Sequence, residues 1–200
     1  MPEQPLTILI AGGVRSGKSA YALVRARELG ARRVFIATAQ AFDDDMRERA
    51  RRHREERGDA FVTVEAPHQL VAALCEASAQ ADVVVIDCLT LWLSNLLLDG
   101  LSQAQITERV HELCALLPTL SAHVVVVSNE VGMGVVPESA LGRAFRDVSG
   151  AAHQALSRAA DELYFAVMGQ LLRLRPAPIE LVPDHARAAR EPDAGHDAGR

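Results

Sequence analysis

The stretch Gly12–Ser19 (GGVRSGKS) constrains the fold more than any other part of the chain, because it matches the pattern G-x-x-x-x-G-K-[ST]. An apolar run at residues 6–11 precedes it, and a helical pattern at residues 18–29 follows it and stops at Gly30. Between a strand and a helix, glycines let backbone N–H groups curl around phosphate oxygens, and the helix N-terminus adds its positive end. The sequence therefore predicts a phosphate-binding loop made of Gly12, Gly13, Val14, Arg15, Ser16, Gly17, Lys18 and Ser19.

Two side chains of this loop carry its chemistry. We expect the Lys18 ammonium to reach the β- and γ-phosphates of a nucleotide and the Ser19 hydroxyl to ligate Mg²⁺. Lys18 is the only lysine of the chain, and a compact charge on a flexible stem suits this position better than a planar guanidinium. A coding bias against lysine would also leave a single one.

Asp87 is the candidate for completing the magnesium site. It ends the apolar run at residues 82–86 (DVVVI), where an acid belongs in this architecture. An aspartate that only starts a turn is the alternative interpretation. Asp82 begins the same run and therefore lies at the opposite end of the predicted strand.

Strand and helix patterns alternate along most of the chain. Further strands are expected at residues 33–37, 61–64, 82–86 and 123–127, and further helices at 43–57, 67–80, 89–98, 106–117 and 139–160. Continuous apolar runs such as DVVVI and HVVVV are typical of strands covered on both faces. The pattern predicts an α/β fold with a mostly parallel sheet covered by helices, and residues 162–167 and 171–175 predict a C-terminal hairpin around Gly169 and Gln170.

The length of 200 residues suits one domain, which we expect to span residues 1–175. Residues 176–200 are rich in proline and alanine and have no long apolar face, so we expect a tail that is flexible or loosely docked.

Composition excludes several classes of protein. A net charge of -5 and an aromatic content of 4% count against a nucleic-acid binder. Three cysteines without a C-x-x-C pair favour a reducing cytoplasm. No apolar run is long enough for a membrane span, and the first residues do not form a signal peptide.

A second cluster of chemically active residues lies at residues 43–57. If this segment is helical, Met46, Ala50, His53 and Arg57 share one stripe. Neighbouring arginines disfavour the imidazolium form, so His53 is expected to be a neutral nucleophile beside cations that can hold a phosphate. A surface histidine on a solvated, salt-bridged helix is the alternative.

Six sequence blocks, taken in order, resemble a known family. They are GGVRSGKS, IATA, DDDMRERARRHREER, TVE, DCLTLWLSNLL and SNEVGMGVVPESALGRAFRDVSG, and they lie within residues 6–175. Together they resemble the bifunctional adenosylcobinamide kinase/adenosylcobinamide-phosphate guanylyltransferase family of cobalamin biosynthesis. Two departures are Phe61, where many members have tryptophan, and the extension beyond Arg175.

The resemblance implies two reactions. ATP or GTP would phosphorylate adenosylcobinamide, and GMP from GTP would then be joined to that phosphate through a histidine–GMP intermediate. It implies a RecA-like P-loop fold, Mg²⁺, and a homotrimer with sites between subunits. Its catalytic residues would be His53 and Lys18, and its metal ligands Ser19 and Asp87. Its nucleotide contacts would be Gly12 to Ser19, Ala37, Thr38, Ala39, Arg54, Glu55, Glu56, Arg57, Glu65 and Asp87.

Two other functions are weighed against this one. A P-loop small-molecule kinase without guanylyl transfer would leave His53 without a role. A RecA-like ATPase acting on nucleic acid conflicts with the charge and the aromatic content. The role of Glu65 also stays open, since a carboxylate can accept hydrogen bonds from a guanine edge or from a ribose.

Overall fold

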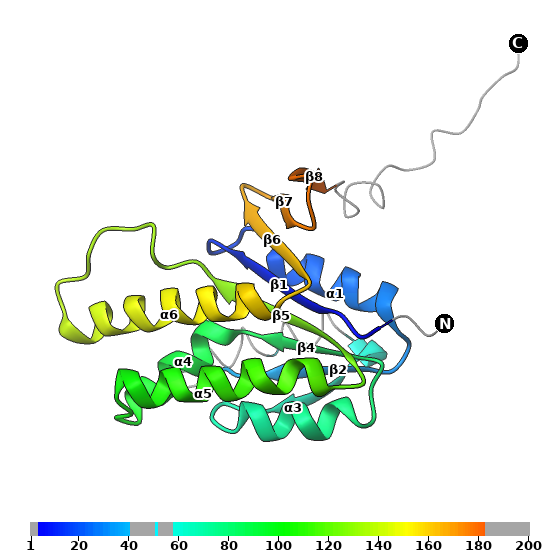
Figure 1. Cartoon of the computed structure of the whole chain (residues 1–200), viewed down its shortest axis with the longest axis horizontal. Helices are drawn as coiled ribbons and strands as arrows, with labels where there is room; N and C mark the ends of the chain where they lie inside the picture. The colour runs from blue at the N-terminus through cyan, green and yellow to red at the C-terminus, as the bar shows by residue number, and fades with distance from the viewer. Residues whose placement is uncertain (1–3, 41–50, 52–57, 183–200) are drawn as a thin grey trace, which may run out of the picture.

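The centre of the molecule is an eight-stranded sheet (Figure 1). The computed structural model describes residues 4–40, 51 and 58–182. The strands are β1 (Thr7–Gly12), β2 (Arg33–Ala37), β3 (Val62–Glu65), β4 (Val83–Asp87), β5 (His123–Asn129), β6 (Glu162–Val167), β7 (Gln170–Arg175) and β8 (Glu180–Val182), in the order β3-β2-β4-β5-β1-β6-β7-β8. Strands β1 to β6 run parallel to one another. Strand β7 pairs antiparallel with β6, and β8 pairs antiparallel with β7. The predicted α/β class with a mostly parallel sheet is confirmed.

Helices cover both faces of this sheet. They are α1 (Lys18–Leu29), α3 (Leu70–Ser78), α4 (Leu89–Leu98), α5 (Gln103–Leu116) and α6 (Ala140–Ala159), with short 3₁₀ helices η1 (Gly58–Ala60) and η2 (Leu117–Thr119). Helices α3 to α6 pack on one face, and α1 packs on the other (Figure 1). Of the helix predicted at residues 43–57, only Arg51 is described, and it is helical. None of the described helices is long and apolar enough to cross a bilayer.

The alternation of side chains along the central strands explains this layering. In β1, Ile8 and Ile10 pack with the core around α1, whereas Leu9 packs with the core under α3 to α6. In β4 and β5, successive valines divide between the two cores in the same way. Because neighbouring residues of a strand point to opposite faces, an unbroken apolar run supplies both cores at once.

The predicted C-terminal hairpin forms, but its turn lies one residue earlier than expected. Val167 pairs with Gln170, so the turn consists of Met168 and Gly169, which both have positive φ angles of 51° and 74°. Two consecutive left-handed residues give the turn whose twist matches that of an antiparallel pair.

The sheet continues beyond the domain boundary that the sequence predicted at Arg175. Residues Glu180–Val182 form β8 against the outer edge of β7, and the Arg173 guanidinium pairs with the Glu180 carboxylate. The exposed edge of β7 offers unpaired backbone groups, and β8 satisfies them with only three residues, too few to form a periodic pattern. Propensity and patterning therefore gave no sign of it.

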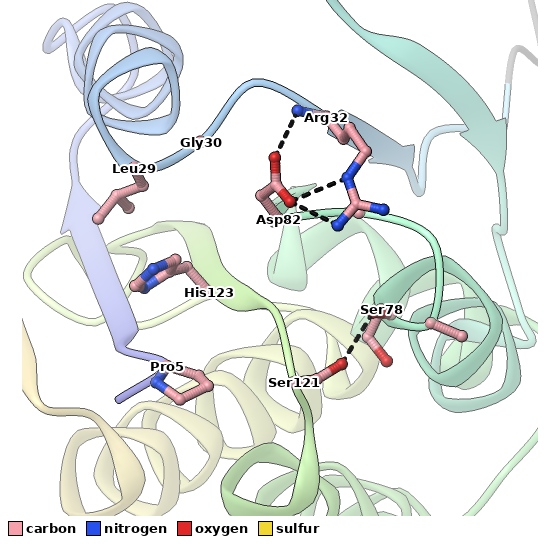
Figure 2. A pocket seen from close by; sticks show the side chains of 10 residues that line it. Pro5, Leu29, Gly30, Arg32, Ser78, Asp82, Ser121 and His123 are labelled. Carbon is pink, nitrogen blue, oxygen red and sulfur yellow. Dashed lines mark hydrogen bonds and ion pairs between the residues drawn. The ribbon is translucent and has the colours of Figure 1, made fainter. Parts of the chain in front are cut away.

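Polar contacts fix the amino ends of the strands. Asp82 precedes β4 and accepts hydrogen bonds from the backbone N–H groups of Ala31 (3.0 Å) and Arg32 (2.8 Å). Its carboxylate also pairs with the Arg32 guanidinium at 2.6 Å, which lowers the pKa of Asp82 to about 2 (Figure 2). These contacts line a hollow of about 440 Å³ at the edge opposite the phosphate loop. This hollow is therefore not part of the nucleotide site.

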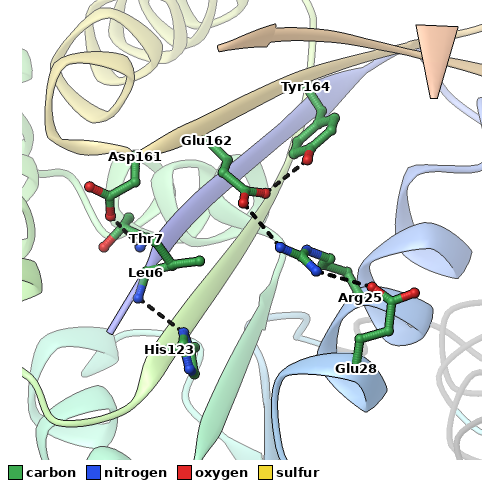
Figure 3. A network of polar contacts seen from close by, with 8 residues as sticks. All are labelled: Leu6, Thr7, Arg25, Glu28, His123, Asp161, Glu162 and Tyr164. Carbon is green, nitrogen blue, oxygen red and sulfur yellow. Dashed lines mark hydrogen bonds and ion pairs between the residues drawn. The ribbon is translucent and has the colours of Figure 1, made fainter. Parts of the chain in front are cut away.

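Strands β1, β5 and β6 are tied together at the same edge (Figure 3). The Leu6 N–H donates to Nδ1 of His123 at 3.0 Å, and the Thr7 N–H donates to the Asp161 carboxylate at 2.7 Å. Arg25 of α1 pairs with Glu162 of β6 at 3.0 Å. These contacts fix the amino end of β1 and helix α1, which are the two elements that the phosphate loop joins.

Candidate nucleotide site

The loop that follows β1 has the tight backbone that a phosphate-binding loop requires. Arg15 and Gly17 both have positive φ angles, of 55° and 92°, and the Ser16 N–H donates to the Gly13 carbonyl at 3.3 Å. Ser16 is 5% exposed, and its hydroxyl has no hydrogen-bond partner among the described residues. A buried polar atom without a partner is costly. The loop thus presents a polar interior that a phosphate would complete.

The beginning of this loop is held against the neighbouring strand. A Cβ atom built on Gly12 would lie 2.3 Å from the Ala166 carbonyl oxygen of β6. Only glycine fits this close approach of two strands, which explains why the first position of the motif is a glycine.

Lys18 lies within the loop and not on the surface. It is 7% exposed, and its ammonium donates to the Gly13 carbonyl at 3.0 Å. The ammonium also acts on the thiol of Cys88, the residue after β4: burial and the Asp87 carboxylate raise the pKa of Cys88 to about 11, and Lys18 opposes this. Lys18 and Asp87 therefore both lie near Cys88, at the carboxyl edge of the sheet.

Three predicted contact residues form a row across the carboxyl edge of the sheet. Ala37 of β2 is in register with Glu65 of β3 on one side and with Asp87 of β4 on the other. The phosphate loop leaves the same edge after β1. Strand order and register thus bring together residues that lie up to 75 positions apart in the sequence.

Thr38, the residue after β2, links the ends of β2 and β4 through hydrogen bonds to the backbone of Cys88. It is fully buried, and its hydroxyl donates to the Cys88 carbonyl at 2.7 Å and accepts from the Cys88 N–H at 2.8 Å. Its own carbonyl accepts from the Asn95 amide at 2.8 Å. The Thr38 side chain is thus engaged inside the protein, whereas Ala37 and Ala39 are partly exposed, and all three stay predicted nucleotide contacts.

The donors at this edge fit Mg²⁺ through their chemistry. The Ser19 hydroxyl and the Asp87 carboxylate are both oxygen donors, and both residues are partly exposed. The described residues contain no group of three histidines, cysteines or acids that could enclose a metal. Mg²⁺ is usually held by one or two protein oxygens together with substrate phosphates, so this sparse donor set suits it.

Several predicted site residues lie outside the part of the chain that the structure describes. These are His53, Arg54, Glu55, Glu56 and Arg57. Gln40, the last described residue before them, lies three positions beyond the carboxyl end of β2, and the description resumes at Gly58 apart from Arg51. The catalytic role of His53 and the four nucleotide contacts stay predictions.

Sequence reasoning missed a chain of polar contacts that begins directly after β5, between Asp87 and the phosphate loop. The Ser128 hydroxyl lies 2.6 Å from Nε2 of His153, and Nδ1 of His153 lies 3.3 Å from the Glu130 carboxylate. One signal was available: Glu130 follows an apolar strand as Asp87 does. No local pattern links it to His153 of α6, because the pairing is tertiary.

Fold and site together define a P-loop nucleotide-binding protein of the α/β class. The sequence model of the family described as "Cobinamide kinase / cobinamide phosphate guanyltransferase" matches residues 8–174, and the chain belongs to this family.

Curated relatives agree along nearly their whole lengths. The chain is 40% identical over 171 residues to "Bifunctional adenosylcobalamin biosynthesis protein CobP" of Pseudomonas aeruginosa, covering 86% of this chain and 98% of the relative. It is 37% identical to "Bifunctional adenosylcobalamin biosynthesis protein CobU" of Escherichia coli and 35% to the Salmonella typhimurium protein of the same name, covering 82% of this chain and 97% of each relative.

Solved structures support the fold. An ATPase domain of known structure superposes with a TM-score of 0.55 at 18% identity, covering 88% of this chain and 80% of the other. The RadB recombinase superposes with a TM-score of 0.50 at 15% identity, covering 87% and 83%. At such low identity the likeness concerns the fold alone, and it confirms the predicted RecA-like P-loop architecture.

Proposed function

We propose that this chain phosphorylates adenosylcobinamide with ATP or GTP, and then transfers GMP from GTP to the new phosphate to give adenosylcobinamide-GDP and pyrophosphate. The observation that carries the proposal is the meeting of the phosphate loop, Lys18 and Asp87 at one edge of a sheet, in a chain that matches the family over residues 8–174. A kinase without guanylyl transfer fits less well, because the curated relatives are named bifunctional.

In the first reaction, the loop holds the triphosphate and stabilises the transferred phosphoryl group. Backbone N–H groups of the loop and the Lys18 ammonium neutralise the charge that develops on its oxygens. Ser19 and Asp87 would hold Mg²⁺, which supplies further positive charge at the phosphates when bound.

In the second reaction, a neutral His53 is the nucleophile. A ring nitrogen attacks the α-phosphorus of GTP, a P–N bond forms, and the bond to pyrophosphate breaks. An oxygen of the cobinamide phosphate then attacks the same phosphorus, and the P–N bond breaks as the imidazole leaves. Dividing one transfer into two gives ping-pong kinetics for this step.

The family resemblance extends the proposal to the protein's surroundings. We propose a cytoplasmic homotrimer whose partners are the nucleotides, adenosylcobinamide and its phosphate, with no nucleic acid among them. Arg54 to Arg57 and Glu65 would contact the bound nucleotide.

The test uses GTP labelled at the α-phosphate. Wild-type protein should acquire an acid-labile, base-stable label, and His53→Ala should acquire none. His111→Ala, which removes an exposed histidine of α5, should label as the wild type does. Lys18→Ala should slow phosphorylation by orders of magnitude. Label retained by His53→Ala would refute the histidine intermediate, and a near-normal rate in Lys18→Ala would remove Lys18 from the mechanism.

A further inference from the structure

A second carboxylate lies beside the phosphate loop, and the function described so far does not use it. Glu130 directly follows β5, and its backbone N–H donates to the Gly12 carbonyl at 2.9 Å. Strand β5 lies between β4, which ends in Asp87, and β1, which leads into the loop. Glu130 therefore shares the edge of the sheet at which the nucleotide is expected.

The protein holds this carboxylate in place from two sides. One oxygen accepts a hydrogen bond from the Gly132 N–H, and the other lies 3.3 Å from Nδ1 of His153 on α6. Behind the ring, Nε2 of His153 lies 2.6 Å from the hydroxyl of Ser128, which is fully buried. The Glu130 side chain keeps 22% of its surface exposed, so a substrate can reach it.

The contacts between Ser128, His153 and Glu130 allow only one assignment of donors and acceptors. A carboxylate only accepts, so Nδ1 of His153 carries the ring proton, and Nε2 accepts from the Ser128 hydroxyl. Burial lowers the pKa of His153, which keeps the ring neutral and restricts it to this single donor. The Ser128–His153 contacts thus hold the Glu130 carboxylate in one orientation.

Phosphorylation of an alcohol needs a group of this kind. As the hydroxyl oxygen attacks the γ-phosphorus, its proton must be accepted by a nearby base. Among the described residues, the carboxylates that end or directly follow strands at this edge are Glu65, Asp87 and Glu130. Glu65 lies four strands from β1, roughly 19 Å at about 4.8 Å per strand, and Asp87 is assigned to Mg²⁺. Glu130 lies one strand from β1 and has no other role.

We propose that Glu130 is the general base of the phosphoryl-transfer step, an inference that rests on the proposed function. The acceptor oxygen forms a bond to the γ-phosphorus, the bond from that phosphorus to the nucleoside diphosphate breaks, and the hydroxyl proton passes to Glu130 and then to solvent. His153 and Ser128 are positioning residues that act through Glu130. Guanylyl transfer needs no such base, because a phosphate monoester is already ionised near pH 7.

The test measures the two reactions separately in Glu130→Gln. Phosphorylation of adenosylcobinamide should fall by about 10²- to 10⁴-fold in kcat. Guanylyl transfer onto supplied adenosylcobinamide phosphate should stay within about twofold of wild type, which also shows that the variant is folded. Glu138→Gln is the matched control, because it makes the same change at an exposed residue of the same loop, and both of its rates should match wild type.

Two results would overturn the assignment: phosphorylation by Glu130→Gln at a near wild-type rate, or equal loss of both reactions, which would mean that the Glu130 side chain supports the structure of the shared site and not the phosphoryl-transfer step. If wild-type protein performs neither reaction, the proposed function fails instead.

The positioning role has its own readout. His153→Asn keeps an N–H donor near the place of Nδ1, so it should recover part of the phosphorylation kcat that His153→Ala loses, with the KM for ATP unchanged in both. Equal loss in the two variants would remove His153 from this role.

Discussion

Substituting Gly12 tests whether the phosphate loop depends on close contact between β1 and β6. In Gly12→Ala, the new Cβ would lie 2.3 Å from the Ala166 carbonyl oxygen, 2.9 Å from its Cβ and 3.0 Å from its carbonyl carbon. An ordinary contact begins near 3.4 Å, so the first of these is about 1.1 Å too short. Two of the three atoms are backbone, and no rotation of a flexible side chain can relieve the overlap.

The strands must therefore move apart by about 1 Å where Gly12 and Ala166 are in register. Overpacking of this kind typically costs about 1–3 kcal/mol, and we expect the upper part of that range because backbone hydrogen bonds of the sheet are stretched. The free energy of unfolding, measured by urea denaturation, gives this cost directly.

Gly13→Ala is the matched control. A Cβ at Gly13 meets nothing within 4 Å, and its φ is not in the left-handed region, so its free energy of unfolding should change by less than about 0.5 kcal/mol. A Gly12→Ala protein as stable as wild type would refute the reasoning, and so would equal losses in the two variants.

Two further predictions concern polar contacts at the carboxyl edge and at the amino edge of the sheet. Thr38→Val leaves the buried Cys88 N–H without its acceptor and should lower the free energy of unfolding by about 1–3 kcal/mol in urea titrations; a loss below about 0.5 kcal/mol would contradict it. Arg32 holds the Asp82 pKa at about 2, against about 3.9 in an unfolded chain, so their contact stabilises the protein above about pH 4 and this stability is lost as the pH falls toward 2. Asp82→Asn should flatten the fall in stability between pH 4 and pH 2, whereas unfolding curves that run parallel to wild type would speak against this.

Much of the fold follows from local patterns that the chain carries in its sequence. Helix α1 spans Lys18–Leu29, as its periodicity and Gly30 predict, and β2 spans Arg33–Ala37 as expected. Helix α4 and strand β6 also have the predicted bounds, and the remaining boundaries moved by one to three residues, as for α3, which begins at Leu70 and not at Pro67. Such shifts arise because helix ends depend on packing and capping as well as on periodicity.

In the candidate site, too, the local features follow from the sequence and the contacts between distant residues do not. A phosphate loop is local, since its glycines, its lysine and its flanking strand and helix are consecutive, and sequence alone locates it. Asp87 could be placed at the carboxyl end of its strand for the same reason. The buried environment of Thr38, by contrast, depends on Cys88 and Asn95, which are 50 and 57 residues away.

By itself, then, the amino-acid sequence determined the alternation of strands and helices, the two-sided burial of β4 and β5, and the loop that curls between β1 and α1. These depend on side-chain periodicity and backbone sterics over a few residues. Only the tertiary structure decided the strand order that sets Glu65, Ala37 and Asp87 in one row, the addition of β8, and the approach of His153 to Glu130. Such pairings are set by how whole elements pack, because the contacts that favour them join residues distant along the chain.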